Sequence, residues 1–144
     1  MISFFVAALI IADQLTKWLT IRFLKPVGSV ELIPHILSLT YVENRGAAFG
    51  IMQNARWFFI AATTVVLVAL VVYAIKTKPD SKLFKVSATL IGAGAVGNLV
   101  DRVARGFVVD MIQVNFVDFP VFNVADCCVV VGGILFCWYI LKEK

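Results

Sequence analysis

Four long apolar runs, separated by shorter polar stretches, dominate the pattern of this chain. They cover residues 2–24, 57–75, 83–103 and 123–141. The second run contains 19 consecutive uncharged residues, close to the roughly 20 that a helix needs to cross a hydrocarbon core of about 30 Å. The pattern therefore predicts an all-α polytopic membrane protein, whose four transmembrane helices form a single domain over residues 1–144.

The polar stretches predict the parts that lie outside the bilayer. Residues 28–50 include alternating runs of strand-forming residues, such as 37–41, bounded by Pro34 and Gly46. We expect a small β-cradle at the membrane surface here. A short interfacial helix is expected to follow it at residues 51–56.

With four spans, the connecting segments alternate between the two sides of the membrane. Segments 25–56 and 104–122 share one side, and the loop 76–82 shares the other side with both termini. Basic residues in short loops are the usual sign of the cytoplasmic side. Four lysines gather at the 76–82 loop: Lys76, Lys78, Lys82 and Lys85. We therefore expect this loop and both termini to be cytoplasmic, and the other two segments to be extracytoplasmic.

The composition agrees with a lipid environment. Hydrophobic residues make up 61% of the sequence, charged residues 15%, and the mean hydropathy is +0.94. A water-soluble domain of 144 residues cannot bury that much apolar surface. The net charge of +4 is spread along the chain without a basic run, so we expect no nucleic-acid partner.

Four aspartates lie in the apolar runs or beside their extracytoplasmic ends: Asp13, Asp101, Asp110 and Asp126. A carboxylate at the centre of a membrane helix costs about 2.5–3.5 kcal/mol on insertion scales. Such residues are usually paired or face an aqueous cavity. A shared polar site is therefore the economical explanation for all four.

Two of these aspartates have a basic neighbour in the sequence. Asp13 precedes Lys17 by one helical turn, and Asp101 directly precedes Arg102. An i, i+4 ion pair is the structural alternative for Asp13. A local ion pair, or a lock at the end of the helix, is the alternative for Asp101.

Asp110 and Asp126 have no such neighbour. Two carboxyls brought together in a poorly solvated site cannot both stay ionised, so one of them keeps a proton. The ionised member can then take a proton from water while the protonated member donates to a carbonyl oxygen. This is the chemistry of peptide hydrolysis without a metal or a covalent intermediate. Spacing alone equally allows two unrelated aspartates at helix ends, one of them an N-cap.

Other catalytic chemistry has little support in the sequence. The single histidine, His35, falls in the strand-like segment, where an exposed or structural role is expected. The three cysteines, Cys127, Cys128 and Cys137, share one apolar run and do not form a zinc-binding pattern. We expect neither a metal nor a cofactor.

Taken together, four sequence blocks resemble the bacterial lipoprotein signal peptidases (signal peptidase II) over essentially the whole chain. The blocks are residues 13–17 (DQLTK), 43–50 (ENRGAAFG), 97–102 (GNLVDR) with 108–110 (VVD), and 122–126 (FNVAD). Each block is short, but their order on four spans is specific. Two positions depart from the common pattern: Gly50 stands where a serine is frequent, and Cys127 where a small polar residue is usual. These departures concern loop shape and substrate range.

The resemblance implies an intramembrane aspartic endopeptidase. Such enzymes remove signal peptides from diacylglyceryl-modified prolipoproteins, cutting N-terminal to the lipidated cysteine at the outer face of the bacterial cytoplasmic (inner) membrane. The resemblance places the catalytic dyad at Asp110 and Asp126. It also implies a polar shell that binds substrate or supports the dyad: Asp13, Asn44, Asn98, Asp101, Arg102 and Asn123. Prolipoproteins and membrane lipids are the expected partners.

Two other functions would use the same aspartates differently. A small proton or cation conduit would use them as a relay, and an assembly subunit would use them only for packing. The elaborate outer segment 28–50 argues against a simple conduit.

Overall fold

The computed structural model describes residues 2–46 and 52–142. In this part of the chain, four helices have the length and apolar composition needed to cross a membrane, which confirms the four predicted spans. The long helices are α1 (Ile2–Leu19), α2 (Arg56–Thr77), α3 (Lys82–Ala104) and α4 (Val124–Lys142). A π-helical turn, η1 (Thr20–Leu24), continues α1 without a break.

A three-stranded antiparallel sheet accompanies the helices, so the description "all-α" is wrong in this respect. Its strands, in the order β1-β2-β3, are β1 (Ser29–Ile33), β2 (Leu37–Asn44) and β3 (Val108–Val114). The first two strands are the predicted β-cradle. Local sequence patterns predict only a connection in the region of β3, because its partner β2 lies about 70 residues earlier in the chain.

The prediction of a short interfacial helix at residues 51–56 is also wrong for residues 52–56, the part of this range that the structure describes. Residues 52–54 form a turn, and α2 begins at Arg56. Met52 and Asn54 have φ values of 55° and 66°. These values lie in the left-handed region, which a right-handed helix cannot include.

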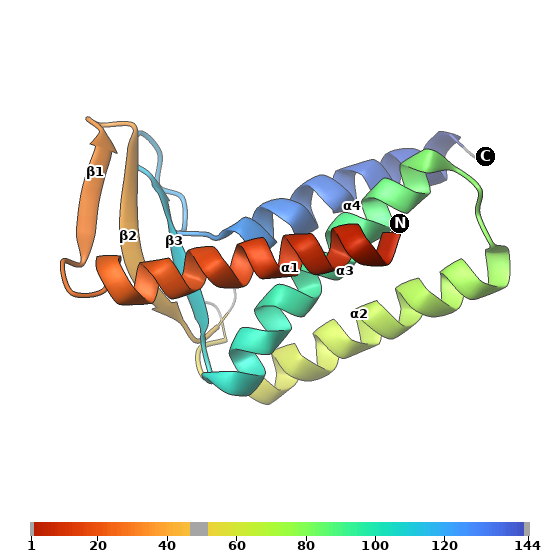
Figure 1. Cartoon of the computed structure of the whole chain (residues 1–144), viewed down its shortest axis with the longest axis horizontal. Helices are drawn as coiled ribbons and strands as arrows, with labels where there is room; N and C mark the ends of the chain where they lie inside the picture. Colours follow the sequence, from red (N-terminus) through yellow and green to blue (C-terminus); the bar gives the residue numbers. More distant parts are fainter. Residues whose placement is uncertain (1, 47–51, 143–144) are drawn as a thin grey trace.

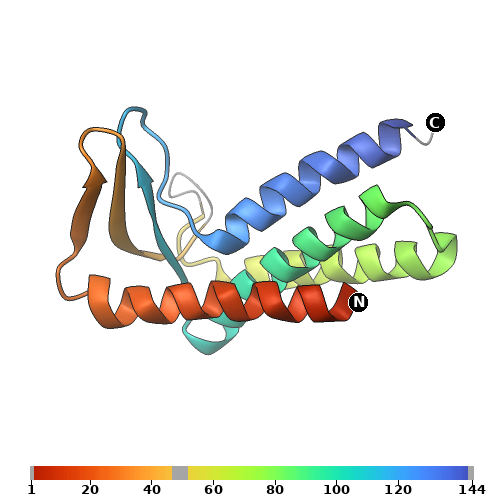
Figure 2. The same ribbon diagram turned by 45° about the horizontal axis from the view of Figure 1, so that its top comes forward.

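The four long helices lie side by side along the long axis of the molecule (Figure 1). The sheet stands at one end, beside η1 and the first turn of α4 (Figure 1). Both termini and the connection between α2 and α3 lie at the opposite end, as a second view also shows (Figure 2). The loop with the clustered lysines is therefore as far as possible from the sheet.

Helix α3 is the centre of the bundle. It has nine buried residues, whereas α2 has none and carries no charged residue from 57 to 75. A long helix that is mostly apolar and has no fully buried residue is typical of a membrane span that faces lipid. Close approach of α3 to α4 depends on Gly94, because a Cβ there would overlap the Ala125 carbonyl oxygen and lie 2.8 Å from Val129 Cγ2.

We predict that Gly94→Ala lowers stability while Gly92→Ala does not. The new methyl at residue 94 meets backbone of α4, which cannot move aside cheaply, so the cost should be about 1–3 kcal/mol. A Cβ at Gly92, in the same helix, would have no neighbour within 4 Å. Thermal unfolding of the two variants in the same detergent gives the comparison. Equal melting temperatures would mean that α3 and α4 do not pack as closely as described.

Candidate active site

Asp110 and Asp126 come from different elements, and each is hydrogen-bonded to Asn123. Asp110 is in the middle of β3, and Asp126 is in the first turn of α4. Alternation along β3 sends Val109 and Met111 to one face of the sheet, where they pack on Leu24. Asp110 therefore points to the opposite face, toward the start of α4.

Asn123, directly before α4, connects the two aspartates. Its side-chain Nδ2 donates to Asp110 Oδ1 at 2.6 Å. Its Oδ1 accepts from the backbone N–H of Asp126 at 2.9 Å, and its own backbone N–H donates to Asp126 Oδ2 at 3.1 Å. This reciprocal pair is a capping box that satisfies the free N–H groups at the start of α4. Asn123 is thus the N-cap, and Asp126 is its partner one turn later.

The remaining carboxylate oxygens of the pair are held by two more asparagines. Asn44, at the end of β2, donates to Asp110 Oδ2 at 2.9 Å. Asn98, on α3, donates to Asp126 Oδ1 at 2.7 Å. Each of the four oxygens therefore accepts one N–H, which fixes both carboxyl groups in place while leaving lone pairs for other partners.

The two aspartates differ in exposure. Asp110 is only 1% exposed, whereas Asp126 is half-buried. Burial raises the pKa of Asp110 from 3.8 to about 6; repulsion from Asp126 adds to this, and hydrogen bonds from Asn44 and Asn123 oppose it. A carboxyl with such a pKa can exchange a proton near neutral pH.

Behind the pair lies a buried cluster around Lys17, whose side chain is 0% exposed. Lys17 Nζ is 2.9 Å from Asp13 Oδ2, 3.0 Å from Asp101 Oδ2 and 2.8 Å from Asn98 Oδ1. Gly97 makes room for this cluster, since a Cβ there would lie 2.5 Å from Asp13 Oδ2. Asp13 and Lys17 therefore form the local ion pair, and this pair is part of a larger polar network.

The two carboxylates of this cluster each reach the backbone beside one member of the pair. Asp13 Oδ1 accepts from Ala125 N–H at 3.0 Å, one residue before Asp126. Asp101 Oδ2 accepts from Val109 N–H at 3.1 Å, one residue before Asp110. Asp13 and Asp101 thus position the strand and the helix that carry the pair.

Asp101 forms ion pairs with Lys17 and with Arg105, but not with the adjacent Arg102. Arg105 Nη1 contacts Asp101 Oδ1 one turn along α3. Arg102 instead lies over the ring of Phe59, 5.0 Å from its centroid, and is attracted by the charges of Asp126, Asp110 and Asp101. Its guanidinium is therefore the cation of α3 that faces the pair.

Comparison with known proteins identifies the family. The family model described as signal peptidase (SPase) II matches residues 5–142. The chain belongs to the signal peptidase II family.

Several curated relatives are similar over nearly the whole chain. The lipoprotein signal peptidase of Caldanaerobacter subterraneus subsp. tengcongensis is 50% identical over 131 residues, which cover 90% of this chain and 88% of the relative. That of Clostridium acetobutylicum is 46% identical over 141 residues, covering 96% of this chain and 92% of the relative. The chain is thus a protease of this family and a multi-pass membrane protein.

Solved structures also share the fold. A bacterial membrane enzyme determined by the in meso method at 2.3 Å resolution matches with a TM-score of 0.90 and 39% identity, covering 99% of this chain and 88% of the other. A second such structure, at 1.9 Å resolution, matches with a TM-score of 0.88 and 39% identity, covering 99% and 94%. The four helices and the small sheet are therefore the architecture of a known membrane enzyme.

The structure brings all eight residues predicted for the site of this signal peptidase II family member into one region: Asp13, Asn44, Asn98, Asp101, Arg102, Asp110, Asn123 and Asp126. Their chemical roles stay predictions. The part of the second sequence block at residues 47–50 lies outside the described residues. His35 lies in an exposed turn with a φ of 62°. In the described part of the chain, no three His, Cys, Asp or Glu residues are placed to hold a metal ion.

Three residues of the cluster were not predicted as site residues. The sequence predicts Lys17 only as a local partner of Asp13, and it assigns no role to Gln14 or Arg105. Gln14 Nε2 donates to the Gly97 carbonyl at 3.1 Å, and its Oε1 accepts from Arg105 at 3.3 Å. The signal for Lys17 and Gln14 was present in the first block, residues 13–17, which places four polar side chains inside an apolar run.

The raised pKa of Asp110 predicts a pH-dependent stability. Between about pH 4 and pH 6 the unfolded chain releases this proton while the folded chain keeps it, so the free energy of unfolding falls as the pH rises. The decrease is at most about 3 kcal/mol. It should be smaller in Asp110→Asn and unchanged in the exposed control Asp118→Asn, as measured by melting temperature in detergent at pH 4, 5, 6 and 7. If the melting temperature of Asp110→Asn changed with pH as it does in the wild type, the raised pKa of Asp110 would be contradicted.

Proposed function

We propose that this chain is an aspartic endopeptidase that removes signal peptides from diacylglyceryl-modified prolipoproteins, cutting N-terminal to the lipidated cysteine. The observation that carries the proposal is the pair Asp110 and Asp126, joined through Asn123 at the edge of an apolar bundle. Membership of the signal peptidase II family supports the substrate class. No described feature favours a conduit or a purely structural subunit.

The chemistry follows from the proximity of two carboxyl groups. One proton is shared by the pair, because two adjacent carboxylates in a poorly solvated site repel each other. The ionised carboxylate takes a proton from a water molecule, whose oxygen attacks the scissile carbonyl carbon. The protonated carboxyl gives its proton to the carbonyl oxygen, which yields a gem-diol intermediate.

The second half of the reaction reverses these roles. The carboxyl that received the proton from water now gives it to the leaving nitrogen as the C–N bond breaks. The other carboxylate takes a hydroxyl proton back from the gem-diol. The products are a signal peptide with a new carboxyl terminus and a lipoprotein with a free amino group on its lipidated cysteine, and the pair regains its starting proton.

The surroundings of the pair suit a lipid-anchored peptide. Asp126 is half-buried and sits at the outer end of α4, so water and a peptide bond can reach it. We infer that Arg102 and Asn44 hydrogen-bond the peptide backbone, a positioning role that needs little reorganisation during the reaction. The apolar surfaces of the helices leave the lipid tails of the substrate in the bilayer.

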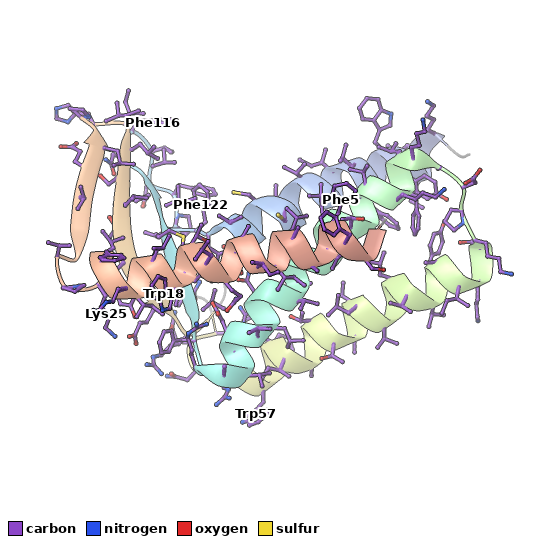
Figure 3. The ribbon with its side chains drawn as sticks, viewed as in Figure 1. Phe5, Trp18, Lys25, Trp57, Phe116 and Phe122 are labelled. Carbon is purple, nitrogen blue, oxygen red and sulfur yellow. The ribbon has the colours of Figure 1, made fainter. Side chains whose placement is uncertain are left out.

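The proposed orientation follows from charge, because exposed tryptophans occur toward both ends of the molecule, Trp138 near the end of α4 among them. The end of the molecule with the sheet carries exposed tryptophans, Trp18 on α1 and Trp57 at the start of α2 (Figure 3). Tryptophan is favoured at membrane interfaces. The opposite end carries the lysine-rich loop and both termini, which we assign to the cytoplasm. The active site then faces the outer side of the bacterial inner membrane, with prolipoproteins and lipids as partners.

Asp110→Asn and Asp126→Asn are each expected to abolish cleavage of a diacylated prolipoprotein by the purified protein. Neither variant can both accept a proton from water and donate one to the carbonyl, so the loss of kcat should be about 10²-fold or more. Asp80→Asn, a fully exposed aspartate in the loop before α3, is the matched control and should cut normally. Full activity in either dyad variant would refute the mechanism. A non-lipidated substrate tests whether the lipid is required.

The orientation is tested by cysteine labelling in intact cells. Cys127, Cys128 and Cys137 are first replaced by alanine, and a single cysteine is then placed at exposed Val27 or exposed Asp80. A membrane-impermeant maleimide should label residue 27 in intact cells, and residue 80 only after lysis. The reverse pattern would overturn the proposed topology.

A further inference from the structure

Lys17 uses all of its hydrogen-bonding capacity inside the protein. An ammonium group has three N–H donors and no acceptor. Here one donor faces Asp13, one faces Asp101 and one faces Asn98, at 2.9, 3.0 and 2.8 Å. The side chain is fully buried in a helix that crosses the membrane. Such a charge is retained only where it has partners, and its position is therefore strongly determined.

The first consequence is geometric. Asp13 and Asp101 hold the backbone N–H groups of Ala125 and Val109, the residues immediately before the two members of the dyad. Lys17 holds both of these carboxylates. Lys17 thus fixes the relative positions of α4 and β3 through two similar series of contacts. One runs through Asp13 to the backbone of α4, and the other runs through Asp101 to the backbone of β3.

The second consequence concerns Asn98. Because Lys17 can only donate, the Oδ1 atom of Asn98 must face it, and Nδ2 of Asn123 also donates to this oxygen at 3.2 Å. The amide of Asn98 is then left with its Nδ2 toward Asp126. Lys17 therefore sets the orientation of the amide that touches a reacting carboxylate.

The third consequence concerns charge. The charged groups around the dyad come from α1, α3, β3 and α4. They are the carboxylates Asp13, Asp101, Asp110 and Asp126 and the cations Lys17, Arg102 and Arg105. Nearby charges on other elements have their own partners: Glu43 and Arg45 on and after β2 pair with each other, and Arg56 of α2 donates to the Val103 carbonyl. Four carboxylates and three cations are electrically neutral when the dyad carries one proton.

We propose that Lys17 is a positioning residue for the reaction: it holds both dyad aspartates in place and balances the buried charge so that the dyad keeps a single proton. This inference rests on the proposed function. Loss of the Lys17 charge leaves one uncompensated negative charge, which the dyad relieves by taking up a second proton. Loss of the Asp13 charge does the opposite and favours the fully ionised dyad.

The test compares pH–rate profiles of Lys17→Met and Asp13→Asn with that of the wild type, using a diacylated prolipoprotein. The dependence of kcat on pH should be bell-shaped, with an acidic and a basic limb. In Lys17→Met both limbs should move to higher pH by about one unit. The value of kcat at the optimum pH should fall about 100-fold, with KM changed little. In Asp13→Asn both limbs should move to lower pH. A purely structural role predicts no such opposite displacements.

Three further variants complete the design. Lys17→Arg keeps the charge and should keep the wild-type limbs. Asp13→Asn/Lys17→Met restores the charge balance, so its limbs should return to wild-type positions while kcat stays low. Lys85→Met, which breaks an exposed pair with Asp80 far from the dyad, should change neither quantity.

The outcomes separate this inference from the proposed function. A wild-type protein that does not cleave the lipidated substrate refutes the function itself. A wild-type protein that cleaves, with inactive Asp110→Asn and Asp126→Asn but with unshifted limbs in Lys17→Met, overturns only the role of Lys17. If Lys17→Met does not fold, Asp13→Asn decides the question, and limbs that stay in place in that variant overturn the proposal.

Discussion

The buried ion pairs of Lys17 with Asp13 and Asp101 are the interaction on which the site depends. Removing an ion from water costs several kcal/mol, and this cost is offset only when geometry is good and every donor and acceptor is used. Lys17 meets this condition with three short contacts. Since its two carboxylates also hold the backbone of β3 and α4, the polar cluster ties four elements into one unit.

Apolar packing has a more limited part in this architecture. It brings α3 close to α4 at Gly94, which lies against the backbone of α4. At Gly97 it brings α3 close to α1 and gives space to the Asp13 carboxylate. Helix packing in lipid lacks the hydrophobic driving force that acts in water, so close contact and polar pairing carry more of the specificity. Helix α2, with no buried residue, lies at the periphery.

In the proposed mechanism, the same cluster holds the two carboxyl groups in position for the reaction. Asp110 is buried and hydrogen-bonded on both oxygens, whereas Asp126 is half-buried at the start of α4. The fixed asparagines between and beside them orient the groups before any substrate arrives. Preorganisation of this kind lowers the cost of reaching the transition state. It fits the membership of the chain in a family of membrane proteases.

The sequence alone determined the four membrane helices, because a long and mostly apolar run has no stable alternative to a helix in lipid. It also identified the aspartates, since each is costly in an apolar segment. The tertiary structure decided the rest. Strand β3 depends on pairing with β2, the turn at residues 52–54 depends on positive φ values, and Asp101 pairs with Lys17 and Arg105 rather than with adjacent Arg102. Local patterns report which residues need a partner, but only the packing of distant segments selects that partner.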